Sequence, residues 1–149
     1  MASYLPGKAP PVLGIEISET QNRPTYMRTF SPLKVTVNFP KDGLGSSSGG
    51  MDYIRGALLK AVPNSERCGS CRVGGEYIRE NVNGSSTDPR TRFSITGTSE
   101  GDRDKVIITC EHIPPDLALR YLGSFLGGLE TDHGNKIPIT GRNLLGGKT

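Results

Sequence analysis

The stretch KVIITCEHIPPDLALRYLGSFLGGLE, residues 105–130, decides the fold because it places a strand next to a helix. Its first part, KVIITCEHI (105–113), is β-branched and almost continuously apolar, which is typical of a buried strand. The Pro-Pro-Asp sequence at 114–116 then begins a helix, since proline suits a first helical turn and an acid stabilises the positive end of the helix dipole. We therefore expect a strand that runs directly into a helix over residues 114–130.

The expected helix carries an apolar surface wider than a helix on the outside of a protein needs. Its apolar residues fall in two adjacent rows, Leu117, Tyr121 and Phe125 in one and Ala118, Leu122, Leu126 and Leu129 in the other. Gly123, Gly127 and Gly128 would let a second backbone come close, because glycine has no side chain. We expect this helix to pack on a sheet or on another subunit.

The clearest strand upstream is LKVTVNF, residues 33–39, which is β-branched and alternates with a period of two. Its apolar residues fall on one face, and its polar residues Lys34, Thr36 and Asn38 fall on the other. RTRFSITGTS (90–99) alternates in the same way. Both segments are predicted to be half-buried strands of an antiparallel sheet.

The remaining segments complete this sheet. VLGIEIS (12–18) and TYMRTF (25–30) flank the turn-forming sequence ETQNRP and are predicted to form an N-terminal hairpin. MDYIRGALLKAV (51–62) contains helix-forming residues, but we interpret it as a strand because it ends before a proline and lacks a clear N-cap. A short strand is also expected in EYIREN (76–81). The predicted fold is α+β: an antiparallel sheet, built from the N-terminal hairpin and a meander, followed by a C-terminal helix.

The chain of 149 residues is predicted to be one domain. An N-terminal arm (1–11), a long loop (63–89) and a C-terminal tail (131–149) surround the elements named above, and the apolar IPI and NLL of the tail suggest docking. A hydrophobic content of 34% and an aromatic content of 6%, with no tryptophan, are low for a core that one chain completes alone. We expect a second copy of the chain to complete the core.

The formal net charge of +3 is compatible with nucleic acid without indicating it. No segment is apolar for long enough to span a membrane, and residues 1–11 lack the apolar centre of a signal peptide. We expect the chain to start in a cytoplasm, where reducing thiols make its three cysteines a poor disulfide framework.

The sequence RCGSCR around Cys68 and Cys71 has three interpretations: half of a zinc site, a redox pair, or a staple in an exposed loop. Structural zinc needs four ligands, usually in two pairs, and Cys110, His112 and His133 do not form a second pair. A thioredoxin-like pair needs a helix directly after it, and RVGGEYIREN predicts none. Neither histidine lies in a pattern typical of catalysis, and GLGSSSGG lacks the lysine of a phosphate-binding loop. We expect no enzyme, no metal and no cofactor.

The residues that the predicted strands turn away from the core form the remaining candidate site. They are Lys34, Thr36, Asn38, Arg92, Ser94, Thr96, Lys105, Ile107, Thr109 and Glu111. A solvated side is ordinary for a half-buried sheet. Hydroxyls, amides and spaced cations also suit RNA, which offers phosphates, 2′-hydroxyls and loop bases. The residues alone leave both interpretations open.

The order of these segments resembles that of the coat proteins of single-stranded RNA bacteriophages, the levivirus group. The resemblance covers roughly residues 12–140 and is closest at two places. KAVPNSERCGSC (60–71) is similar to the loop after the fifth strand of the family, and VIITCEHIPPDLALRYLGSFLGGLE (106–130) looks like its last strand running into its first helix.

This resemblance implies a homodimer with one continuous sheet that faces RNA, and helices that lie over the sheet of the partner. Such dimers would assemble into an icosahedral virion in the cytoplasm of a bacterial host, package single-stranded RNA, and bind an RNA hairpin as a translational repressor, without a membrane. Cys68 and Cys71 would form disulfides between neighbouring subunits. The predicted RNA-binding residues are Lys34, Thr36, Asn38, Arg55, Lys60, Arg92, Ser94, Thr96 and Thr109. A matrix-like viral assembly protein, or a small thiol-redox or zinc protein, remain the alternatives.

Overall fold

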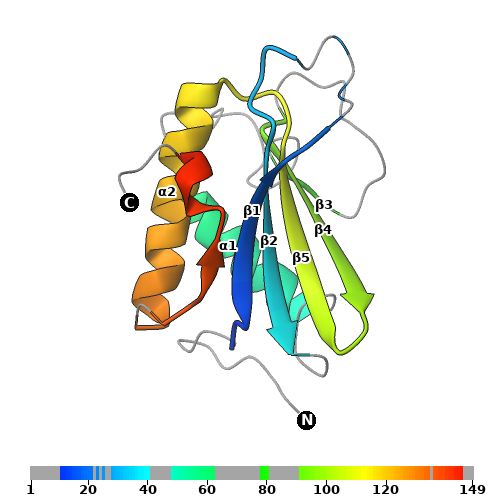
Figure 1. Cartoon of the computed structure of the whole chain (residues 1–149), viewed down its shortest axis with the longest axis vertical. Helices are drawn as coiled ribbons and strands as arrows, with labels where there is room; N and C mark the ends of the chain where they lie inside the picture. The colour runs from blue at the N-terminus through cyan, green and yellow to red at the C-terminus, as the bar shows by residue number, and fades with distance from the viewer. Residues whose placement is uncertain are drawn as a thin grey trace.

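The structure of the chain is a computed structural model, and the residues that it describes are 11–21, 23, 25, 28–40, 48–62, 78–80, 91–134 and 136–145. The strands are β1 (Gly14–Glu19), β2 (Leu33–Pro40), β3 (Ile78–Glu80), β4 (Phe93–Glu100), β5 (Arg103–Cys110) and β6 (Ile139–Thr140). The helices are α1 (Ser48–Ala61), α2 (Pro115–Asp132) and the short 3-10 helix η2 (Arg142–Leu145). Figure 1 shows α1 and α2 on one side of the sheet.

The strands form one six-stranded sheet in the order β3-β4-β5-β2-β1-β6. The central strands are antiparallel to one another, whereas the short edge strands β3 and β6 run parallel to β4 and β1. Segments distant in the sequence meet in the centre, where β2 pairs with β5 and Val35 lies opposite Ile108. The prediction of an α+β fold with a mostly antiparallel sheet is confirmed.

Alternate residues of the central strands and one stripe of each helix form the core. The main buried side chains are Ile15, Ile17, Val35, Val37, Phe39, Phe93, Ile95, Val106 and Ile108 from the sheet, with Ile54, Leu58, Tyr121, Leu122, Phe125 and Leu129 from the helices. The Tyr53 hydroxyl of α1 also donates to the Asp132 carboxylate of α2 at 2.8 Å. Among the residues whose burial is described, Leu13 is the one large apolar side chain that is exposed. A second copy that completes the core stays a prediction.

The prediction of a strand over 51–62 is wrong, because residues 51–61 lie in helix α1, which ends one residue before Val62. Met51, Ile54 and Leu58 are buried, and their spacing of three and four residues matches one face of a helix. Alanine, leucine and methionine favour a helix, and Lys60 lies in the last turn, where a cation is favourable to the helix dipole. The proline that follows in the sequence ends a helix as readily as a strand.

The predicted N-terminal hairpin is wrong in its second strand, since β1 pairs with β2 on one edge and with β6 on the other. The described residues between β1 and β2 form turns instead. The Arg23 guanidinium donates to the carbonyl oxygens of Phe30 and Ser31, at 2.8 and 2.7 Å, which keeps this connection folded. The predicted meander is also wrong, because the chain enters α1 after β2 and the second neighbour of β2 is β5.

Helix α2 confirms the helix predicted over 114–130. One stripe of it is buried, which comprises Ala118, Tyr121, Leu122, Phe125, Leu126 and Leu129. Gly123, Gly127 and Gly128 lie on the exposed side, where an added Cβ would meet no atom within 4 Å. The close approach expected at these glycines is therefore not made within the described part of the chain.

The described part of the tail docks on the sheet and on α2. β6 pairs with the edge of β1, and Arg142 of η2 forms an ion pair with Glu130 of α2. Gly141, between β6 and η2, has a φ of 84°, and an added Cβ would lie 2.1 Å from the carbonyl oxygen of Ile17. Only glycine fits this position without moving the tail away from β1.

Candidate nucleic-acid interface

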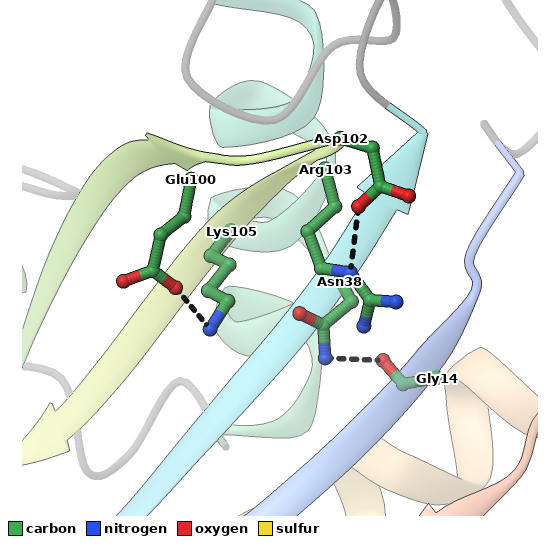
Figure 2. A network of polar contacts seen from close by, with 6 residues as sticks. All are labelled: Gly14, Asn38, Glu100, Asp102, Arg103 and Lys105. Atoms are coloured by element: carbon green, nitrogen blue, oxygen red, sulfur yellow. Dashed lines mark hydrogen bonds and ion pairs between the residues drawn. The ribbon is translucent and has the colours of Figure 1, made fainter.

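The polar face is the side of the sheet turned away from α1 and α2. We define it as Glu16, Ser18, Lys34, Thr36, Asn38, Ser94, Thr96, Thr98, Arg103, Lys105, Ile107 and Thr109. These residues share one side because they alternate with the buried core residues along each strand and lie opposite one another between strands. Figure 2 views part of this face, with the helices behind the sheet.

Six of the nine predicted RNA-binding residues lie on the polar face. They are Lys34, Thr36, Asn38, Ser94, Thr96 and Thr109. The pairing register sets one row across four strands, in which Lys34 has Ser18 on one side and Thr109 on the other, and Thr109 in turn lies opposite Ser94. The sequence predicted the face of each strand, and the register that brings the strands together comes from the fold.

Exposure divides these six residues into two groups. Thr36, Asn38 and Ser94 are buried, with exposed fractions of 7%, 2% and 7%, whereas Lys34, Thr96 and Thr109 are half-buried. β2 lies in the middle of the sheet, so its short side chains are flanked by residues of β1 and β5. A polymer could therefore reach Lys34, Thr96 and Thr109 directly, whereas it could reach Thr36, Asn38 and Ser94 only when neighbouring side chains move.

The cations on the polar face differ in their partners. Lys105 Nζ lies 2.6 Å from a carboxylate oxygen of Glu100, and Arg103 Nε lies 3.7 Å from one of Asp102 (Figure 2). The hydrogen bond and the charge of Lys105 hold the pKa of the Glu100 carboxyl below its ordinary value. Lys34 has no ion-pair or hydrogen-bond partner among the described residues. Lys34 is thus the cation best placed to meet an incoming anion.

Arg92 and Ser94 are partly engaged within the protein. The Arg92 guanidinium donates to the carbonyl oxygen of His112 at 2.8 Å, and the Ser94 hydroxyl donates to the Glu111 carboxylate. Glu111 is 3% exposed, and a buried polar group needs hydrogen bonds of this kind. These contacts tie the start of β4 to the end of β5, and give both predicted RNA-binding residues a structural role.

Arg55 and Lys60 are not part of the polar face, so their expected position on a strand of the sheet is wrong, whereas RNA binding by them stays a prediction. They lie on α1, in the layer that covers the opposite side of the sheet (Figure 1). Arg55 forms an ion pair with Asp52 at 2.7 Å, three residues earlier in the helix, and Lys60 is exposed. The error follows directly from the interpretation of this segment as a strand.

The structure describes one of the three cysteines, Cys110. Cys68 and Cys71 lie outside the described residues. Cys110 is free and buried, and burial raises the pKa of its thiol to about 12, which keeps it protonated and unreactive. His112 is buried with its ring edge-to-face on Phe30, at 5.2 Å between centroids.

No group of three or more histidine, cysteine or acidic side chains is arranged to hold a metal ion in the part of the chain that the structure describes. Neither described helix is long and apolar enough to cross a membrane.

The hairpin between β4 and β5 contributes residues that the list of predicted RNA-binding residues lacked. Glu100 and Lys105 come from either side of the turn at Gly101 and Asp102, and the Asn38 amide lies beside them (Figure 2). The Gly-Asp pair in the sequence is a known signal for a two-residue hairpin turn, which would have predicted that its flanking charges meet. The proximity of Asn38 depends on the pairing of β2 with β5, which no local signal gives.

Comparison of the chain with known protein families, with curated proteins and with solved structures found no match.

Proposed function

We propose that this chain is a non-enzymatic coat protein that binds single-stranded RNA on the polar face of its sheet. The observation that carries the proposal is the row of Ser18, Lys34, Thr109 and Ser94, which runs across four strands on the side without helices. It combines one cation that has no partner among the described residues with hydroxyl groups on either side of it.

The chemistry of this row suits an RNA backbone. Lys34 offers a compact positive charge for a phosphate, and the Ser18 and Thr109 hydroxyls can donate to phosphate oxygens or accept from a 2′-hydroxyl. The Ser94 hydroxyl, which donates to Glu111, can still accept. No aromatic ring stands on the polar face as defined by its twelve described residues. Stacking of bases on aromatic rings is therefore not what these residues supply, and we expect binding that depends strongly on salt.

The assembly part of the proposal rests on the resemblance to levivirus coat proteins. A strand that passes directly into an apolar helix, as β5 and α2 do, is its closest point. The helix at residues 48–61, where the resemblance implied a strand, departs from it. Four further proposals rest on the same resemblance: dimerisation, a closed shell, disulfides of Cys68 and Cys71 between subunits, and repression through an RNA hairpin.

The test is to express the chain alone in bacteria and separate the product by size-exclusion chromatography. Absorbance at 260 and 280 nm and negative-stain microscopy of the leading peak report nucleic acid and particle shape. We expect uniform closed particles that contain RNA. Open sheets or membrane-bound material would favour a matrix-like protein, and a monomer without RNA would contradict the proposal altogether.

A further inference from the structure

A second cluster of polar groups lies on the polar face at the turn between β4 and β5 (Figure 2). The pairing of the strands places Asn38 of β2 opposite Lys105 of β5, with Arg103 two residues nearer the turn. In Figure 2 the side-chain amide of Asn38 lies between the ends of these two cations. Gly101, with a φ of 63°, allows the tight turn that holds Arg103 and Lys105 beside β2.

The Asn38 side chain is the unusual member of this cluster. Its Nδ2 donates to the carbonyl oxygen of Gly14 at 3.5 Å, which is long for such a bond. This contact fixes the orientation of the amide, because the Gly14 oxygen can only accept. The Oδ1 atom is then left buried without a hydrogen-bond partner among the described residues, on a residue that is 2% exposed. Buried acceptors of this kind are rare in folded proteins, and a group that donates to Oδ1 would remove the penalty.

The two cations beside Asn38 are held by exposed acids. The side chains of Glu100 and Asp102 are 69% and 93% exposed, whereas those of Lys105 and Arg103 are 24% and 42% exposed. Exposed ion pairs add little to stability, since water screens them. A phosphate that brings its own charge can therefore replace these carboxylates with little loss.

We infer that Asn38, Lys105 and Arg103 form a ribose-phosphate subsite of the RNA surface, kept closed by Glu100 and Asp102 until RNA displaces them. A phosphate oxygen takes the place of the Glu100 carboxylate on Lys105, and the 2′-hydroxyl of the adjoining ribose donates to Asn38 Oδ1. The inference rests on the proposed function, and it adds a specific property, the preference for RNA over DNA.

The chemistry of Asn38 selects this ligand over simpler ones. A phosphodiester alone would satisfy Lys105 and Arg103, but its oxygens carry no proton to donate to Oδ1. DNA carries the same phosphates without the 2′-hydroxyl, which is the group that distinguishes RNA at a given site. A buried water that donates to Oδ1 is the remaining occupant, and it would produce no preference between the two polymers.

The experiment measures affinity for two twelve-nucleotide oligomers, oligouridylate and oligodeoxyuridylate, which differ only in the 2′-hydroxyl. Glu100→Gln frees Lys105, so we expect affinity for both oligomers to rise about threefold to tenfold. The control is Asp116→Asn, which removes one exposed negative charge from α2, away from the polar face. Asn38→Leu keeps the branched shape of the side chain and removes the acceptor, so affinity for the RNA oligomer should fall to that for the DNA oligomer.

Each outcome decides between the explanations. Equal affinity of the wild-type chain for both oligomers, or a preference that Asn38→Leu leaves intact, would overturn the ribose contact and leave a bound water. A Glu100→Gln variant that behaves like Asp116→Asn would overturn the phosphate contact, and it does so even where Asn38→Leu fails to fold. Loss of all binding in every variant, wild type included, would instead contradict the proposed function itself.

Discussion

The central residues on the two sides of β2 are buried to nearly the same extent, but different interactions stabilise them. Val35, Val37 and Phe39 face the helices and are 0% exposed, while Thr36 and Asn38 face the other way and are still only 7% and 2% exposed. The first group fills space in an apolar core, where close packing sets the energy. The second group has charged as well as apolar neighbours on β1 and β5, so hydrogen bonds and charges also contribute to its energy. Burial alone therefore does not tell which side of this strand supports the fold and which is available for binding.

We expect the largest loss of stability from a truncated side chain on the side of β2 that the helices cover. Phe39→Ala removes a ring from the core and should lower the free energy of unfolding by about 3–5 kcal/mol. Thr36→Val, on the other side of the same strand, keeps the shape and should change it by less than about 1 kcal/mol. Urea denaturation of both variants measures the difference. Similar losses for the two variants would show that both sides are packed in the same way.

The tail protects the edge of the sheet, where β6 pairs with β1. Gly141→Ala places a Cβ 2.1 Å from the Ile17 carbonyl oxygen and forces alanine into the left-handed region, which alone costs about 1–2 kcal/mol. We expect β6 and η2 to separate from β1 while the central strands stay folded. Hydrogen exchange of the β1 amides should then accelerate, with Gly134→Ala as a control for left-handed strain without a clash. Equal exchange in both variants would contradict a specific role for the contact with Ile17.

Substitutions on the polar face should change the affinity for RNA and leave the stability of the fold nearly unchanged. Lys34→Ala removes the cation that has no partner among the described residues, so it should weaken RNA binding and lower the slope of log affinity against log salt by about 1. Lys60→Ala removes the same charge from α1, in the opposite layer, and should leave both unchanged. Fluorescence anisotropy with labelled RNA over a salt series compares them. Equal losses would mean that binding follows total charge and not the polar face.

The smallest effect concerns the acid that holds Lys105. The Lys105 ammonium holds the pKa of Glu100 below the ordinary value of 4.5, so this pair stabilises the fold above that pH and the contribution is lost as pH falls through the lowered pKa. An NMR titration should give Glu100 a midpoint below 4.5, and Lys105→Ala should return it upward. An unchanged midpoint in Lys105→Ala would show that the two side chains are apart in solution.

Long, regular patterns were predicted well from the sequence, and partnerships between distant segments were not. β2 and α2 were found because eight and eighteen residues repeat one period each. The sequence of α1 gives two conflicting signals, because the proline that follows it suits the end of a strand while the spacing of Met51, Ile54 and Leu58 suits a helix. The second strand of the hairpin was chosen by proximity in the sequence, whereas β2 is the partner of β1 in space. A local pattern indicates the face of a residue, but only the register of strands indicates its neighbours.

The same limit applies to the candidate interface. Lys34, Thr96 and Thr109 were placed on one face by alternation, and they lie there. The buried acceptor of Asn38 could not be predicted, because it arises from Gly14 on one side and Lys105 on the other. These residues lie far apart in the chain.

The pairing of β6 with β1 bears on how the chain folds during its synthesis. Residues 139–140 border residues 15–16, so β1 is synthesised before the other described strands and gains its outer neighbour after them. Until then the edge of β1 is open to pairing with other strands, including those of nascent chains on the same message. Acquisition of the complete sheet is therefore coupled to translation of the tail, and slow translation of that region would lengthen the time during which the chain is prone to aggregate.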